Sequence, residues 1–190
     1  MVAVRGMSED APEGFLDVVS RLRAATLRPE VTLEEVPAPQ RIAPFALALS
    51  ADVESDGDEL ATGRFVLLHD PTGPEAWHGT YRCVTFVRAG LESDLGQDAM
   101  LGQVGWSWLE ESLSVGGAEH IAAGGTVTRV VSETFGALAG PPPTVEIEVR
   151  ASWTPLNDLV IHLDAWSNLL CTVAGLPPLP DGVSALHRRH

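Results

Sequence analysis

Three stretches of the chain repeat apolar residues at the spacing of an amphipathic helix. In residues 11–27, Phe15, Val18, Val19 and Leu22 follow the i, i+3, i+4, i+7 pattern. A second stretch begins near Asp94 and continues to Leu113. A third follows Thr154 and Pro155, which suit the N-cap and the first helical position, and it ends at Gly175. The pattern predicts three helices, which begin near residues 11, 94 and 155.

Alternating apolar and polar residues predict strands between these helices. The alternation is clearest in residues 144–153, where Val145, Ile147 and Val149 face one side while Glu146 and Glu148 face the other. The other predicted strands are residues 45–53, 62–68, 80–88 and a segment that ends at 131, with 31–36 as a short strand or edge segment. One wet face is typical of an antiparallel sheet. We therefore expect an α+β fold with an antiparallel sheet of about five strands and three helices, in the order α-βββ-α-ββ-α.

Proline and glycine clusters divide the chain. Residues 1–9 precede the first predicted helix and are expected to be disordered. Residues 10–176 are predicted to form a single α+β domain. Residues 177–190 begin with two prolines and are predicted to form an extended, Pro-rich C-terminal tail.

The second and third predicted helices share residues at a constant offset of 60 positions. The identical pairs are Asp98 and Asp158, Trp106 and Trp166, Ser107 and Ser167, and Leu109 and Leu169. Each helix follows a hairpin-like stretch, so one hypothesis is a duplicated ββα unit. The alternative is that two amphipathic helices coincide by chance.

Composition and charge exclude several function classes. Of 190 residues 45% are hydrophobic, which suits a packed globule, and no apolar stretch reaches membrane-spanning length. Acidic residues number 26 against 12 arginines and no lysine, so the net charge is −14. Such a field repels phosphate backbones and anionic membranes, so we expect neither nucleic acid nor a membrane as partner. The N-terminus does not read as a signal peptide, which favours a cytoplasmic protein.

Residue types that carry catalysis or bind cofactors do not form a recognised set. The absence of lysine excludes Schiff-base chemistry through that residue, and no nucleophile or phosphate-loop motif is present. Cys83 and Cys171 lie far apart among apolar residues. Asp158 and His162 share a helix face, but two ligands do not make a metal site, so we interpret them as a surface pair. We expect no catalytic residues, metal or cofactor.

Five residues are candidates for contact with a partner or ligand. Trp77, His78 and Arg82 lie in or beside a turn-rich segment, and aromatic residues with arginine are typical of recognition surfaces. The alternative is that Trp77 folds back onto the core. Trp106 and Trp108 stand two apart on the second helix and so point to different faces.

The second predicted helix is apolar around most of its circumference, unlike a helix with one wet face. Gly102 and Gly105 would let another element approach closely. We therefore predict a homodimer through this helix, and a protein partner is a further prediction. The favoured function is a non-catalytic protein-binding or chaperone-like adaptor. The alternative is a small-ligand-binding protein or enzyme with a pocket between sheet and helices.

Several segments resemble an uncharacterised actinobacterial family, the domain of unknown function DUF3000. They include residues 28–31, 61–64, 67–71, 105–109, 150–155 and 175–178. The resemblance runs from about Leu27 to Pro178 and implies an intracellular actinobacterial protein without implying an activity. The element order alone is similar to that of type III secretion chaperones, which are acidic, cytoplasmic, often dimeric proteins that hold other polypeptides.

Overall fold

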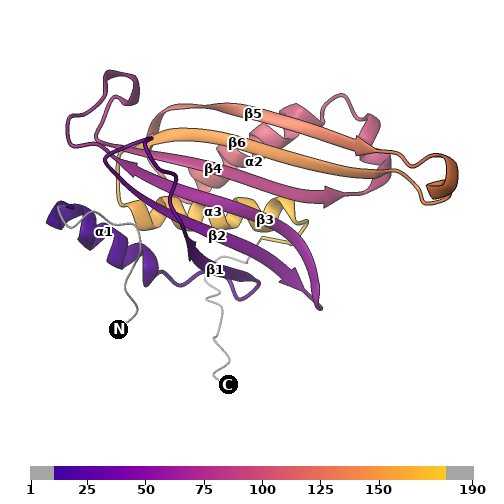
Figure 1. The fold of residues 1–190 in the computed structure, drawn as a ribbon, viewed down its shortest axis with the longest axis horizontal. Coiled ribbons are helices and arrows are strands. Elements are labelled where there is room, and N and C mark those ends of the chain that lie inside the picture. The colour runs from indigo at the N-terminus through magenta and orange to yellow at the C-terminus, as the bar shows by residue number, and fades with distance from the viewer. Residues whose placement is uncertain (1–10, 179–190) are drawn as a thin grey trace.

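The structure is a computed structural model that describes residues 11–178, and it has the predicted α+β architecture (Figure 1). The strands are β1 (Val31–Val36), β2 (Phe45–Ser55), β3 (Asp58–His69), β4 (Tyr81–Leu91), β5 (His120–Ser132) and β6 (Thr144–Pro155). The α-helices within these residues are α1 (Glu13–Arg23), α2 (Leu101–Val115) and α3 (Leu159–Val173). Short 3-10 turns occupy Glu75–Trp77, Ser93–Gln97 and Gly136–Leu138.

The sheet has six antiparallel strands in the order β1-β2-β3-β4-β6-β5. The prediction of about five strands was therefore too low. The additional strand is β1, which pairs with β2 from Val31 to Val36 although its sequence contains Glu34 and Glu35. Charged residues can occupy this strand because it is an edge strand with exposed side chains.

Both longer helices lie behind the same face of the sheet (Figure 1). α3 packs on β2, β3 and β4, whereas α2 packs on β5 and β6. Gly63 lets α3 approach closely, because a Cβ atom there would lie 2.7 Å from Leu170 Cδ2 and 2.9 Å from the Phe86 carbonyl oxygen. The main core therefore forms between the sheet and the helices, around the fully buried Trp153 and Trp166.

Two predicted helix starts were wrong for local reasons. Asp98 adopts an extended conformation and its carboxylate accepts a bond from Met100 N, so a 3-10 turn precedes α2 and the helix begins at Leu101. Thr154 and Pro155 end β6 instead of starting α3, because the Thr154 hydroxyl is held by the Trp77 carbonyl in extended backbone. Asp158 caps α3, accepting a bond from Val160 N at 2.9 Å.

The predicted N-terminal segment 1–9 and most of the predicted tail 177–190 lie outside the described residues. The hairpin β3–β4 followed by α2, and the hairpin β5–β6 followed by α3, meet where β4 pairs with β6. Each helix covers the strands of the other unit. Their tryptophans differ, since Trp166 is fully buried and Trp106 is only partly buried. Duplication stays a hypothesis.

Candidate functional site

Three of the five predicted contact residues lie around one end of β6. Trp77 packs against a small cluster of Ala48, Val66 and Leu68 on the open face of the sheet, apart from the main core between sheet and helices. Arg82 donates to Ser152 Oγ at 2.7 Å and to Thr154 Oγ1 at 3.0 Å. His78 is exposed and has a positive φ of 55° at the end of the 3-10 turn. Contact of these residues with a partner stays a prediction.

The other two predicted residues lie on opposite flanks of α2. Trp108 faces a groove beside α3, while Trp106 packs against the edge of the main core. Gly105 faces the sheet, where a Cβ atom would lie 2.7 Å from Ile147 Cδ1. The close approach that this glycine permits is therefore to β6, whereas Gly102 has open space around it.

A groove of about 740 Å³ runs between α2 and α3. The α1–β1 connection, through Leu27 and Arg28, and the segment after α3, through Leu176 and Pro178, also line it. The groove therefore lies between two helices, not between sheet and helices as the alternative function supposed. Among the five predicted contact residues only Trp108 lines it.

The α3 wall of the groove is polar. Asp164, Asn168 and Thr172 are spaced four apart and so share one face of the helix. Desolvation by the surrounding protein atoms raises the pKa of the Asp164 carboxyl, although this side chain is open to the groove. Asn168 Nδ2 donates a hydrogen bond to the carboxylate, but at the long distance of 3.5 Å. On the α2 wall, the side-chain carboxylate of Glu111 makes no hydrogen bond or ion pair within residues 11–178. Neither carboxylate has a cationic partner in this part of the chain.

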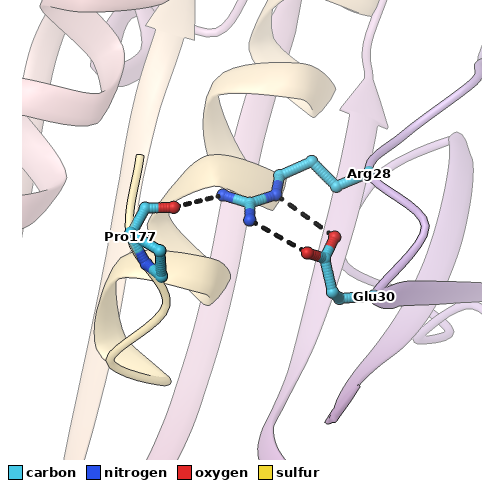
Figure 2. Close-up of polar contacts among 3 residues, drawn as sticks. All are labelled: Arg28, Glu30 and Pro177. Atoms are coloured by element: carbon cyan, nitrogen blue, oxygen red, sulfur yellow. Dashed lines mark hydrogen bonds and ion pairs between the residues drawn. The ribbon is translucent and has the colours of Figure 1, made fainter. Parts of the chain in front are cut away.

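Arg28 closes the groove and is already neutralised (Figure 2). Its Nε and Nη2 donate to Glu30 at 3.4 and 3.1 Å, and its Nη1 donates to the Pro177 carbonyl oxygen at 3.1 Å. The hydrogen bond from Arg28 lowers the pKa of Glu30. Arg28 thus connects the α1–β1 connection to the segment after α3, two parts of the chain 149 residues apart. No sequence pattern predicted this contact.

His162 is fully buried, so its interpretation as a helix-surface residue was wrong. Trp153 Nε1 donates to its Nδ1 at 3.0 Å, and its Nε2 donates to Asn157 Oδ1 at 2.9 Å. Burial, with a smaller effect of His120, lowers its pKa to about 4. Asp158, its predicted neighbour on the surface, instead caps α3 and pairs with Arg21. The donor Trp153 Nε1 and the acceptor Asn157 Oδ1 occupy both ring nitrogens, so neither is free to bind a metal.

The remaining candidate groups for chemistry are occupied or buried. His69 Nδ1 donates to the Thr80 carbonyl oxygen, and its ring stacks on Phe15 and Tyr81. Burial raises the pKa of the Cys83 thiol strongly and that of Cys171 to about 11. Such thiols stay protonated and are poor nucleophiles. Within residues 11–178 no group of three or more His, Cys, Asp or Glu side chains is arranged to hold a metal ion.

The edge strand β5 is a second candidate site that the sequence analysis missed. Residues 124–132 pair with β6 in continuous register, after a bulge between Ile121 and Gly124. No hydrogen bond joins the outward backbone groups of residues 121–132 to any residue that the structure describes. Arg129 is the only Asp, Glu, Lys or Arg in this strand. Its β-branched residues and low charge were visible in the sequence, but its position at the edge was not.

The end of the β5–β6 hairpin protrudes beyond the other strands (Figure 1), and it carries exposed apolar side chains. Phe135 and Leu138 are 76% and 73% exposed, and Val131 at the end of β5 is 47% exposed. The strand and its hairpin end therefore combine free backbone groups with exposed apolar side chains. Among the helices of residues 11–178, none combines the length and the apolar character needed to cross a membrane.

Comparison with known proteins identifies the family. A family model described as a protein of unknown function, DUF3000, matches residues 11–184. The chain belongs to this family. The resemblance inferred from its sequence segments is thereby confirmed, and the membership carries no established activity. No curated protein and no solved structure matches the chain.

Proposed function

We propose that this member of the DUF3000 family is a non-catalytic, cytoplasmic protein-binding adaptor that holds an extended polypeptide segment along β5. The observation that carries the proposal is the long outer edge of this strand. A partner segment would add a seventh strand and bind the backbone groups of residues 124–132. In such binding the main-chain hydrogen bonds give affinity and the alternate side chains give specificity.

The sequence of β5 favours pairing over solvation. Thr126, Val127, Thr128, Val130 and Val131 are β-branched and prefer the extended conformation. Natural proteins usually block long edge strands with charge, proline or a covering element, and residues 124–132 contain one charge and no proline. The bulge at the start of β5 restricts the pairing surface to the part that follows it.

One residue predicted from the sequence, Trp106, lies on the helix that packs against this strand. α2 packs on β5, so a strand added there would meet the outer flank of α2, on the side of Trp106. Trp77 and Arg82 contact Thr154, which pairs with Ile121 before the bulge, so these two residues lie apart from residues 124–132. A homodimer that pairs β5 with the β5 of a second copy would use the same surface, together with the second helix that the sequence suggested.

A matched pair of variants tests this proposal. Thr32 and Thr128 are exposed and stand at opposite ends of one row of paired residues across the sheet, Thr32 on β1 and Thr128 on β5. The substitution Thr128→Lys places charge on the proposed binding edge, and Thr32→Lys is its control. Light scattering at several protein concentrations and affinity capture from native lysate would be run on both variants and on wild type.

We expect wild type and Thr32→Lys to retain the same polypeptide partner, and Thr128→Lys to lose it, with at least a tenfold weaker affinity. A dimer that is lost only in Thr128→Lys would identify a second copy as the segment held. A monomer without a partner, or a partner retained equally by Thr128→Lys, would refute binding along β5.

A further inference from the structure

We propose that the groove between α2 and α3 binds a small organic cation, an ammonium or guanidinium group carried on an apolar stem. This site is separate from β5, because α2 presents one flank to the groove and packs on β5 through other residues. Its volume of about 740 Å³ is that of a small-molecule site. The ligand class follows from charge, aromatic content and the side chains that are already paired.

The groove has an excess of negative charge. Glu111, Asp164 and Arg28 are the charged residues of its lining, and Arg28 is paired with Glu30 outside the lining. The lining therefore carries one positive and two negative charges, or −1, in a chain whose net charge is −14. An anion would have to approach the two carboxylates, and within residues 11–178 the one cation of the groove wall is already paired. A cation would meet two carboxylates that have no cationic partner within residues 11–178.

The surroundings of Asp164 favour an ion pair. Protein atoms around this carboxylate raise its pKa, which means that its charged form is less well stabilised than in water. Its contact with Asn168 Nδ2, at 3.5 Å, is too long to compensate. A ligand cation would restore that stabilisation through a charge-assisted hydrogen bond.

Trp108 and the apolar ends of the groove select an organic cation over a metal ion. Trp108 and Glu111 stand three apart on α2, so an indole ring and a carboxylate share one wall. Tryptophan is the best aromatic partner for a cation. Leu27 and Leu176 form apolar parts of the lining that would accommodate a stem. A hydrated metal ion would gain nothing from these three apolar side chains.

Arg28 does not neutralise Asp164, because its guanidinium is already bound to other groups. Its three donor nitrogens are held by Glu30 and by the Pro177 carbonyl oxygen (Figure 2). The arginine therefore forms a fixed end wall, and it does not compete with a ligand cation for the α3 carboxylate.

The test is a calorimetric titration of the full chain with agmatine, which carries a guanidinium and an ammonium group on an aliphatic stem. Titrations at high ionic strength screen most of the general attraction of a cation to an acidic protein. The variants are Asp164→Asn, Glu111→Gln and Trp108→Leu. Glu110→Gln is the matched control, because Glu110 is exposed on α2 outside the groove. Neutral n-pentanol and citrate serve as ligands without positive charge.

We expect saturable binding of agmatine to wild type and to Glu110→Gln, and about tenfold weaker binding for each groove variant. Asp164→Asn and Glu111→Gln keep side-chain size, so they test the site even if Trp108→Leu is unstable. Absence of saturable binding to wild type would overturn the proposal. So would equal binding by Asp164→Asn and Glu110→Gln, or equal affinity for n-pentanol or citrate.

Discussion

Thr32 and Thr128 occupy the two ends of one row across the sheet, yet their strands present very different edges. β1 has six residues, two of them glutamates, and Pro37 follows it directly. Arg23 of α1 donates to Glu35 at 2.6 and 2.9 Å, so a helix reaches this edge. β5 has 13 residues and a single arginine. The edge at β1 therefore carries the charge, proline and covering helix that usually prevent a further strand from pairing, and the edge at β5 lacks most of these features.

The same contrast holds for the helices behind each end of the sheet. Ten residues of α3, which covers β2, β3 and β4, are buried, against four residues of α2, which covers β5 and β6. A helix with so little burial and so many apolar residues is usual beside a partner. The β1 end of the molecule is thus the more fully buried and the more protected from pairing, and the proposed binding of a polypeptide at the β5 end rests on this difference.

The largest effect is expected when Trp166 of α3 and Trp106 of α2, which stand 60 positions apart, are each replaced by alanine. We expect Trp166→Ala to lower the free energy of unfolding by about 4 kcal/mol, because the fully buried ring leaves a cavity. The substitution Trp106→Ala should lower the free energy of unfolding by less than about 2 kcal/mol, because this ring is only partly buried. Urea denaturation of the isolated chain measures both. Equal losses would mean that the two ends are equally well packed.

A second test uses pH at the covered end. The pKa of His162 is lowered from 6.5 to about 4, so the histidine is neutral in folded and unfolded chains above pH 6.5. Below that, the unfolded chain takes up a proton that the folded chain does not. The free energy of unfolding should therefore fall by about 3 kcal/mol between pH 6.5 and pH 4.

His162→Gln removes this titration while the carboxylates titrate in both proteins. The difference in unfolding free energy between wild type and variant should shift by about 3 kcal/mol in favour of the variant over that range. Urea denaturation at pH 7, 5.5 and 4 would measure it. A difference that stays constant with pH would show that His162 protonates normally in the folded chain.

A third, smaller effect is expected where β1 is attached. Arg28→Gln should lower the free energy of unfolding by about 1–2 kcal/mol, because the buried guanidinium holds Glu30 and the Pro177 carbonyl. Arg88→Gln is the control, since its pair with Glu146 lies on the exposed face and should cost below about 0.5 kcal/mol. Thermal unfolding compares the two, and equal shifts would contradict a structural role of Arg28.

The smallest expected effect concerns the edges themselves. Thr32→Lys and Thr128→Lys should each change the free energy of unfolding by less than about 0.5 kcal/mol, because both side chains are exposed. Hydrogen exchange should find outward amides of residues 124–132 unprotected in a dilute monomer and protected once a partner is bound. If Thr128→Lys lost stability and Thr32→Lys did not, misfolding would explain the loss of binding in Thr128→Lys.

The sequence predicted most of the architecture because alternation in β2, β3, β4 and β6 reflects one buried face. It misplaced the start of α2 because the Asp98 carboxylate bonds Met100 N, two residues on, in place of capping a helix that begins near Asp94. It misplaced the start of α3 because the Thr154 hydroxyl bonds the Trp77 carbonyl, which is distant in sequence. β1 was left ambiguous since an edge strand needs no apolar alternation.

The candidate sites were less predictable. Trp108 was predicted as a contact residue, and it lines the groove. The other lining residues come from α3 and from the segments after α1 and α3, which no local pattern connects with Trp108. His162 was misinterpreted because Asp158 and His162 share a helix spacing, while Trp153 and Asn157 decide its burial. The outer position of β5 depends on strand order, since β6 is inserted between β4 and β5.

That strand order has a consequence for synthesis of the chain. β4 pairs with β6, about fifty residues later in the sequence, so the centre of the sheet closes only after β6 has left the ribosome. α3, the last helix, covers strands made near the beginning. Until residues 159–173 emerge, the apolar face of β2, β3 and β4 is covered only in part, where Phe15 of α1 meets Phe45 and His69. The nascent chain therefore needs protection from aggregation until α3 packs onto these strands.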